Sequence, residues 1–262
     1  MKRLVAVAMA FASMPAFAGI SYDFRTSTTG ISSQTIAGAV QAEGKNIRID
    51  VETGDGVLFQ SGSFVVSSDG GQTMRVANPS DRTWYQLNLS EILGGGDALL
   101  KQLGGAVNLE VRNPKVSVSG GTDAGALEGF PAKKSTVQTG YELALSGLGQ
   151  PMTMTMAVTS DVWWTDKIAP ELTNFLQMRG LRTGVDAVDK LIAAQTDAIK
   201  GFPLKQVTTT TISFSGRDMT TTSTSTVSNV KQAAVAASAF TIPAGFEKTA
   251  SPVEKMFGAL QR

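Results

Sequence analysis

The chain has 262 residues, with 23 basic and 22 acidic side chains and neither cysteine nor histidine. This near-neutral balance gives no electrostatic footprint for nucleic acid or anionic lipid. Without histidine and cysteine there is no His-based triad, thiol nucleophile, disulfide or ordinary zinc site. We therefore expect a protein that is not an enzyme and that uses no cofactor or metal.

Residues 1–18 have the pattern of a cleavable signal peptide. Lys2 and Arg3 precede a short apolar stretch, and Ala16-Phe17-Ala18 is a small-x-small cleavage site. We expect cleavage after Ala18 and export to the bacterial periplasm. No later apolar run is long enough to cross a bilayer, so we expect no transmembrane anchor.

Residues 19–87 are predicted to form short antiparallel strands joined by turns. Tyr22–Thr29 is rich in β-forming residues, and residues 35–42 alternate in polarity. Ile47, Ile49 and Val51 alternate with polar neighbours. Strands at hairpin spacing argue against a parallel sheet with crossover helices.

A three-stranded meander is predicted between Phe64 and Leu87. Asp69-Gly70-Gly71 suits a tight hairpin turn, and Asn78-Pro79-Ser80-Asp81 suits a type I turn. Alternation predicts one apolar face, formed by the pairs Phe64/Val66, Met74/Val76 and Tyr85/Leu87, and one polar face. Another part of the chain must then cover the apolar face.

Residues 88–105 have helical spacing that is interrupted by Gly94-Gly95-Gly96. We interpret the segment as two short helical pieces with a joint between them. A phosphate-binding loop is the alternative, but the Walker lysine and serine are missing, which favours a simple loop or hinge.

Strands are predicted again at 107–119, 133–145 and 151–164. In the last of these, Met152, Met154 and Met156 share one face of the strand. Three interpretations stay open for these methionines: ordinary core packing, a deformable apolar wall for a ligand, and a thioether Cu(I) site.

Trp163 and Trp164 are adjacent on the same predicted strand, so their rings must point to opposite faces. We expect one ring to be buried and the other to lie nearer solvent. The outer ring either covers the sheet edge or stacks on a sugar or a partner.

Two helices are predicted after this strand, at residues 166–179 and 185–200, followed by threonine-rich strands over residues 204–230. Ser251-Pro252-Val253-Glu254 is a capping box, which opens a predicted C-terminal amphipathic helix at 249–262. That helix either docks on the sheet or binds a partner.

Several short motifs together resemble exported bacterial proteins of the DUF4412 type. They include Tyr22-Asp23-Phe24, the Gly44–Asp50 hairpin arm, the Asp69–Tyr85 meander, Val162–Asp166 and Phe240–Lys248. The resemblance implies a LolA/LolB-like fold, similar to the periplasmic lipoprotein carriers, in which an unclosed barrel wraps around helices. It implies an apolar cavity for lipid or acyl chains, and it carries over no catalytic residue.

These observations predict an α+β fold: a curved antiparallel sheet, forming an unclosed barrel, with helices packed on its concave face. Residues 19–248 would form one domain after the signal peptide. The predicted function is an exported, non-catalytic carrier whose partner is a lipid, an acyl chain or a lipoprotein. Its ligand-binding residues would be Met152, Met154, Met156, Trp163, Phe175, Leu176, Val188 and Leu191. The alternative is an envelope-associated interaction or sensing module without a small-molecule ligand, and an enzyme is the third hypothesis.

Overall fold

The computed structural model describes residues 19–56, 60–88, 108–146, 151–168, 186–197, 199–252 and 254. The side chains of 108–109 and 186–188 lie outside this description. Residues 89–105 of the predicted helical segment, residues 169–179 of the predicted helix 166–179 and the predicted C-terminal helix beyond residue 254 also lie outside it. Of the described remainder, Asn88 ends a strand, and residues 166–168 form a bend rather than the start of a helix.

The described strands form one sheet in the order β12-β6-β5-β4-β3-β2-β1-β11-β10-β9-β8-β7. Every pairing is antiparallel except that of β12 with β6. The bounds are β1 Gly19–Thr29, β2 Gln34–Glu43, β3 Asn46–Thr53, β4 Phe64–Ser67, β5 Thr73–Asn78, β6 Thr83–Asn88, β7 Asn108–Leu127, β8 Phe130–Ser146, β9 Met152–Thr165, β10 Phe202–Phe214, β11 Arg217–Gln232 and β12 Glu247–Lys248.

The predicted α+β class is wrong. In the part of the chain that the structure describes, strands far outweigh helix, which amounts to α2 at Asp186–Asp197, a 3-10 turn η2 at Ala237–Phe240 and the helical residues Pro252 and Glu254. The architecture is one large unclosed sheet rather than a sheet covered by helices. The threonine-rich segments extend into long hairpins, because β-branched side chains favour a pleated surface.

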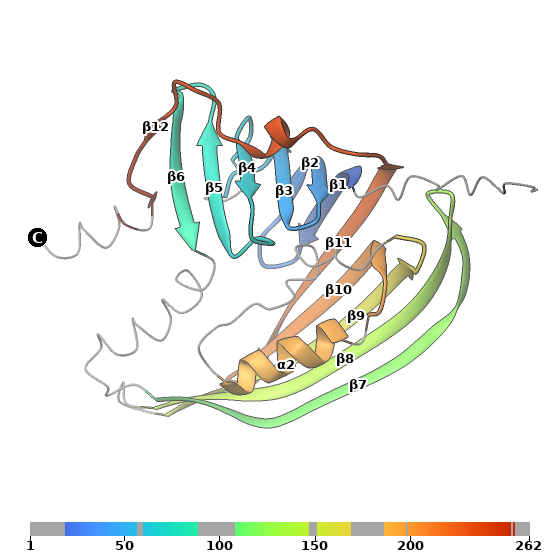
Figure 1. Cartoon of the computed structure of the whole chain (residues 1–262). Coiled ribbons are helices and arrows are strands. Elements are labelled where there is room, and N and C mark those ends of the chain that lie inside the picture. Colours follow the sequence, from blue (N-terminus) through green and yellow to red (C-terminus); the bar gives the residue numbers. More distant parts are fainter. Residues whose placement is uncertain are drawn as a thin grey trace, which may run out of the picture.

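The sheet bends sharply, which divides it into two halves that face one another (Figure 1). We call β1–β6 the short-strand half and β7–β11 the long-strand half. The inner face is the one that carries Val76, Tyr22 and Met154, and the cross-strand register keeps this face continuous from β6 to β7.

The main core lies where the inner faces of the two halves meet. Tyr22 packs edge-on against Phe202 with ring centroids 5.2 Å apart, and this contact joins β1 to the start of β10. Buried apolar residues from both halves surround it: Ile20, Val40, Ala42, Ile47, Ile49, Val51, Val65, Met74, Val76, Leu87, Ala132, Ile168, Leu204 and Val227.

The meander prediction is correct for its strands but wrong for the faces of β4. Val65 lies on the inner face opposite Val76, whereas Phe64 and Val66 lie on the outer face. All four residues of β4 are therefore buried. The polar outer face that alternation predicted does not exist at β4, because a later segment covers it.

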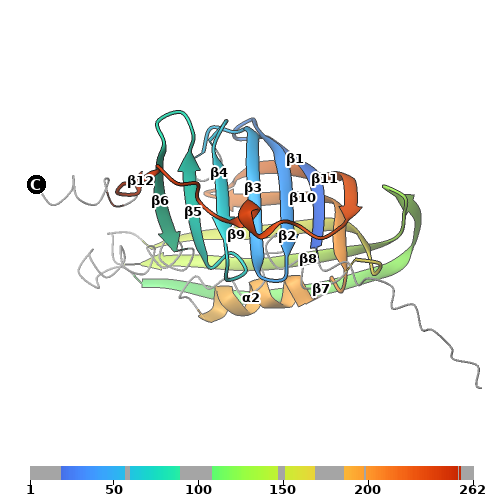
Figure 2. The same cartoon turned by 45° about the horizontal axis from the view of Figure 1, so that its top comes forward.

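The covering segment, residues 236–248, crosses the outer face of the short strands (Figure 2). Ile242 and Phe246 pack on the cluster of Phe64, Val66 and Ala77. Arg48 donates a hydrogen bond of 3.1 Å to the Ala239 carbonyl. The segment ends as β12, which pairs with β6 and protects that edge of the sheet.

The turn chemistry agrees with the sequence. Gly70 and Gly71 have φ of 80° and 92°, values that glycine adopts readily. The Asp69 carboxylate accepts hydrogen bonds from the Thr73 N–H and the Ser67 hydroxyl. Partial burial raises the pKa of Asp69, but these hydrogen bonds outweigh it and lower the pKa on balance.

Candidate ligand-binding face

A continuous group of apolar side chains lies on the inner face at one end of the long strands. We call this the free end; it carries Ser146, Met152 and Phe214. Met156 lies between Tyr141 on β8 and Ile212 on β10, and Met154 lies between Leu143 and Phe214. We call this group the apolar band: Val111, Tyr141, Leu143, Leu145, Met152, Met154, Met156, Ile212, Phe214 and Met219.

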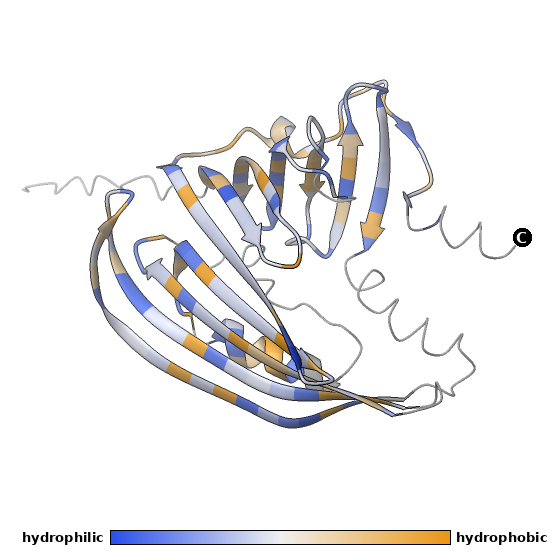
Figure 3. Cartoon of the chain, turned by 180° about the vertical axis from the view of Figure 1, so that it is seen from behind, coloured by the Kyte–Doolittle hydropathy of each residue, from blue (hydrophilic) through white to orange (hydrophobic). Residues whose placement is uncertain are grey.

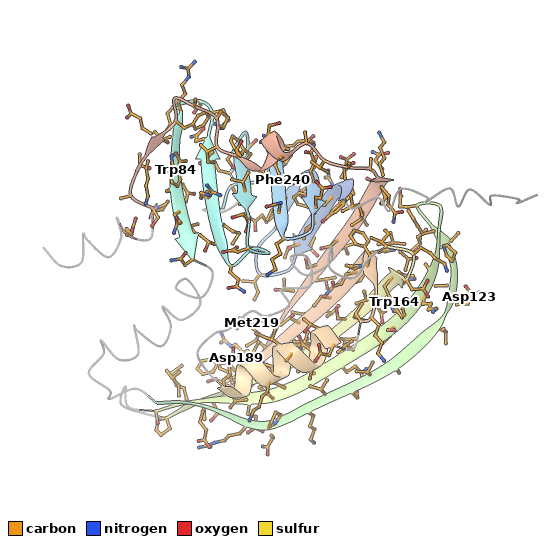
Figure 4. The ribbon with its side chains drawn as sticks, viewed as in Figure 1. Trp84, Asp123, Trp164, Asp189, Met219 and Phe240 are labelled. Atoms are coloured by element: carbon orange, nitrogen blue, oxygen red, sulfur yellow. The ribbon has the colours of Figure 1, made fainter. Side chains whose placement is uncertain are left out.

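The apolar band is accessible, unlike the main core. Met152 and Met219 are 40% and 41% exposed, and the other members are half-buried. Figure 4 shows Met219 beside the lower part of the long strands, far from Trp164. Partial burial raises the pKa of the Tyr141 hydroxyl.

A row of uncharged polar side chains separates the apolar band from the main core. In Figure 3, hydrophobic and hydrophilic residues alternate along the long strands. We call this row of uncharged polar side chains the polar belt: Thr26, Thr28, Ser160, Gln206, Thr208, Ser223 and Ser225. Its members hydrogen-bond to one another across the strands, for example Thr26 to Ser225 at 2.9 Å and Ser160 to Thr208 at 2.8 Å.

Helix α2 lies over β7 and β8 on the inner face (Figure 1). Gln195 donates a hydrogen bond of 2.7 Å to the Thr139 hydroxyl, and Leu191 is buried. Just after the helix, Ile199 packs with Val137, Val162 and Trp164. The contacts of α2 are with β7 and β8, whereas much of the apolar band lies on β9, β10 and β11.

The structure brings together only some of the predicted ligand-binding residues. Met152, Met154 and Met156 lie side by side on the inner face, where Leu191 of α2 also lies buried. Val188 belongs to α2, but its side chain lies outside the described residues, as do Phe175 and Leu176 entirely. Trp163 points to the outer face, so it cannot line the same surface as the methionines.

The two tryptophans divide as predicted. Trp164 is buried and donates a hydrogen bond of 3.0 Å to the Ser135 hydroxyl. Trp163 lies on the outer face, where the ammonium groups of Lys134 and Lys205, one from each neighbouring strand, lie 4.7 and 4.9 Å from its ring centroid. Because both neighbouring strands place a lysine over the indole, a stacked sugar would have to displace them.

Asp161 completes this outer-face cluster. It accepts a hydrogen bond of 2.5 Å from the Thr136 hydroxyl and forms a 3.0 Å ion pair with Lys134. The Thr136 hydrogen bond and then Lys134 lower the pKa of the Asp161 carboxyl. The cluster is thus a solvated, paired set of charges, typical of an exposed sheet surface.

Sequence reasoning missed the members of the apolar band on β7, β8, β10 and β11. Ile212 and Phe214 alternate at the end of a threonine-rich strand, and Met219 follows the Ser215-Gly216 turn. Pairing the two strands about that turn would have placed all three beside the methionines.

The described part of the chain has neither a metal-binding cluster nor a membrane-spanning helix. No group of three or more acidic side chains there is arranged to hold a metal ion. Within the same residues, no helix has the length and hydropathy needed to cross a membrane.

The comparisons with known proteins give one finding. No protein-family model matches the chain, so the resemblance to DUF4412 proteins finds no support, and no curated protein matches its sequence. Among solved structures, the chain is similar to a LolA superfamily protein, NE2245 from Nitrosomonas europaea. That match has 11% identity and a TM-score of 0.31 and covers 86% of this chain and 91% of the other. A likeness of this degree carries no argument about function.

Proposed function

We propose that this protein is an exported, non-catalytic binding or carrier protein of the bacterial periplasm. Its ligand is a lipid or another molecule with an acyl chain, and the chain lies along the apolar band. One observation carries the proposal: ten apolar side chains from five strands form a continuous and partly exposed surface on the inner face. Exposed apolar surface of this kind marks binding sites in soluble proteins.

The chemistry of the band supports a flexible apolar ligand. Its three β9 methionines and Met219 have unbranched, polarizable side chains that adapt to differently shaped partners. The band extends over three successive rows, those of Met152, Met154 and Met156, and side chains on one face of a strand repeat every ~6.8 Å. Such a surface has the length of an extended hydrocarbon chain rather than of a compact ligand.

A matched pair of variants tests the proposal. Met154→Lys places a charge in the band, whereas Thr155→Lys places the same charge on the opposite, outer face of the same strand. Binding of the neutral fluorophore N-phenyl-1-naphthylamine should fall at least about tenfold in Met154→Lys and stay unchanged in Thr155→Lys, since a charge in an apolar site is costly.

Lipid mass spectrometry on protein purified from its native periplasm provides the second test. We expect co-purifying acyl lipids in the wild-type protein and fewer in Met154→Lys. A folded wild-type protein that carries no lipid and does not bind the fluorophore would contradict the carrier function and leave the interaction module as the better hypothesis.

A further inference from the structure

The polar belt indicates the chemistry of the polar group that a ligand carries when its acyl chain lies on the apolar band. On β9 and β10 the belt lies on the same face as the apolar band, and one row, that of Val158 and Thr210, lies between them. Its members are six hydroxyl groups and one amide, and none of them is ionisable. A ligand chain that lies on the band and extends toward the main core therefore meets uncharged hydrogen-bonding groups first.

The belt retains hydrogen-bonding capacity after its internal contacts are counted. The Gln206 amide nitrogen donates to both Ser160 and Thr208, at 2.9 and 3.0 Å, and these two hydroxyls also contact each other. The Gln206 amide oxygen accepts no hydrogen bond from a described residue, and each hydroxyl has two lone pairs and one proton to share. The belt can thus both donate to and accept from a ligand.

Charge argues against an anionic group at this position. Among the strand residues on the inner face of the long-strand half, the described cations lie at the two ends, and Lys190 of α2, over β7 and β8, is exposed to solvent. Lys133 is paired with Asp166 beside the main core, and Arg217 begins β11 at the free end. Transferring a carboxylate or phosphate to a half-buried row without a cation costs more than hydroxyl contacts return. An ester or hydroxyl oxygen carries no such cost.

From this arrangement we infer that the ligand is an uncharged amphiphile of the acylglycerol class. Its chain lies on the apolar band, and its ester and hydroxyl oxygens hydrogen-bond to Ser160, Gln206 and Thr208 of the polar belt. This inference rests on the proposed function, and it deepens that function by specifying the polar part of the ligand.

The test compares 1-monooleoylglycerol with oleate, which has the same chain but a carboxylate. Calorimetry below the aggregation concentration of each probe should show tighter binding of 1-monooleoylglycerol to the wild-type protein. Thr208→Val removes a belt hydroxyl, and Thr209→Val is the matched control because the Thr209 hydroxyl lies on the outer face against Thr222.

We expect Thr208→Val to weaken 1-monooleoylglycerol about five- to tenfold, the effect of one or two hydrogen bonds. Oleate binding should change less than twofold, and Thr209→Val should change neither probe. Ser160→Ala gives a second measurement if Thr208→Val fails to fold.

Two results would overturn the inference while leaving the carrier function intact. One is tighter binding of oleate than of 1-monooleoylglycerol, with oleate weakened by Arg217→Gln, which would place a carboxylate at the free end. The other is equal binding of 1-monooleoylglycerol to Thr208→Val and Thr209→Val. Failure of the folded wild-type protein to bind either probe would contradict the proposed function itself.

Discussion

The two halves of the sheet differ in how much apolar surface they leave exposed. In the short-strand half, β4 is buried on both faces, between the main core and the segment 236–248. In the long-strand half, by contrast, the methionine end of β9 is half-exposed on its inner face and exposed on its outer face. The comparison indicates that stability is concentrated in the short-strand half, whereas the long-strand half keeps apolar surface available for a ligand.

The largest expected effect concerns close backbone approach. A Cβ on Gly38 would lie 2.0 Å from the Asp50 carbonyl oxygen, whereas a Cβ on Gly140 of β8 would lie 3.9 Å from its nearest neighbour. We expect Gly38→Ala to lower the free energy of unfolding by about 3 kcal/mol or more, and Gly140→Ala by less than about 1 kcal/mol. Chemical denaturation measures both, and equal losses would contradict the division between the halves.

A phenylalanine side chain can be removed from the segment that covers the short-strand half and from the long-strand half. Both side chains are half-buried, but Phe246 packs on Phe64, with ring centroids 6.1 Å apart, whereas Phe214 belongs to the apolar band. Phe246→Ala should cost about 2 kcal/mol, and Phe214→Ala about 1 kcal/mol or less. In thermal unfolding, each kcal/mol corresponds to roughly 2–4 °C for a chain of this size. A larger loss from Phe214→Ala would mean that the band is structural core.

Tyrosine hydroxyls offer a comparison with a smaller effect of opposite sign. Tyr22 is 3% exposed, its burial raises the pKa of the hydroxyl, and that hydroxyl bonds to no described residue. Removing an unsatisfied buried hydroxyl is favourable, so Tyr22→Phe should stabilise the protein by about 1 kcal/mol. Tyr141→Phe, in the half-exposed band, should be neutral. Destabilisation by Tyr22→Phe would show that its hydroxyl has a partner.

The smallest effect is a pH dependence shared by both halves. Asp69 and Asp161 have lowered pKa values, so each contributes stability that is present above the ordinary aspartate pKa and lost as pH falls through its folded value. We expect a constant melting temperature from pH 5 to 8 and a decline below about pH 4. Asp69→Asn and Asp161→Asn should each make that decline shallower, and an unchanged decline in both would assign it to other carboxyl groups.

Local patterns in the sequence predicted the strands well, because alternation and turn residues act over a few positions. Gly70, Gly71 and the Ser251–Glu254 capping box all have the expected local geometry, and Glu254 and Ser251 exchange two hydrogen bonds. The faces of β4 could not be predicted in this way, because Phe64 is covered by Phe246, which lies far along the chain. The α+β class was wrong because it was based on helical spacing in a few segments, and such spacing does not show how large a share of the fold the sheet makes up.

The candidate site was predicted in part. Alternation found Met152, Met154 and Met156, since a strand shows its own face in its sequence. Ile212 and Met219 were missed because the register between β9, β10 and β11 places them beside the methionines, and that register is not visible in any one strand. Trp163 was also named as a ligand-binding residue, but its odd-numbered position on β9 places it on the outer face, opposite the even-numbered methionines.

Photo-crosslinking tests the central claim most directly. The probe is the methyl ester of a fatty acid with a diazirine near the end of its chain, bound to the wild-type protein and mapped by tandem mass spectrometry. We predict that the crosslinks fall on inner-face residues of the apolar band, chiefly Met152, Met154, Met156 and Met219, and that excess unlabelled 1-monooleoylglycerol abolishes them. Crosslinks confined to outer-face residues such as Thr153 and Thr155, or unaffected by the competitor, would contradict the assignment of this band as a ligand-binding surface.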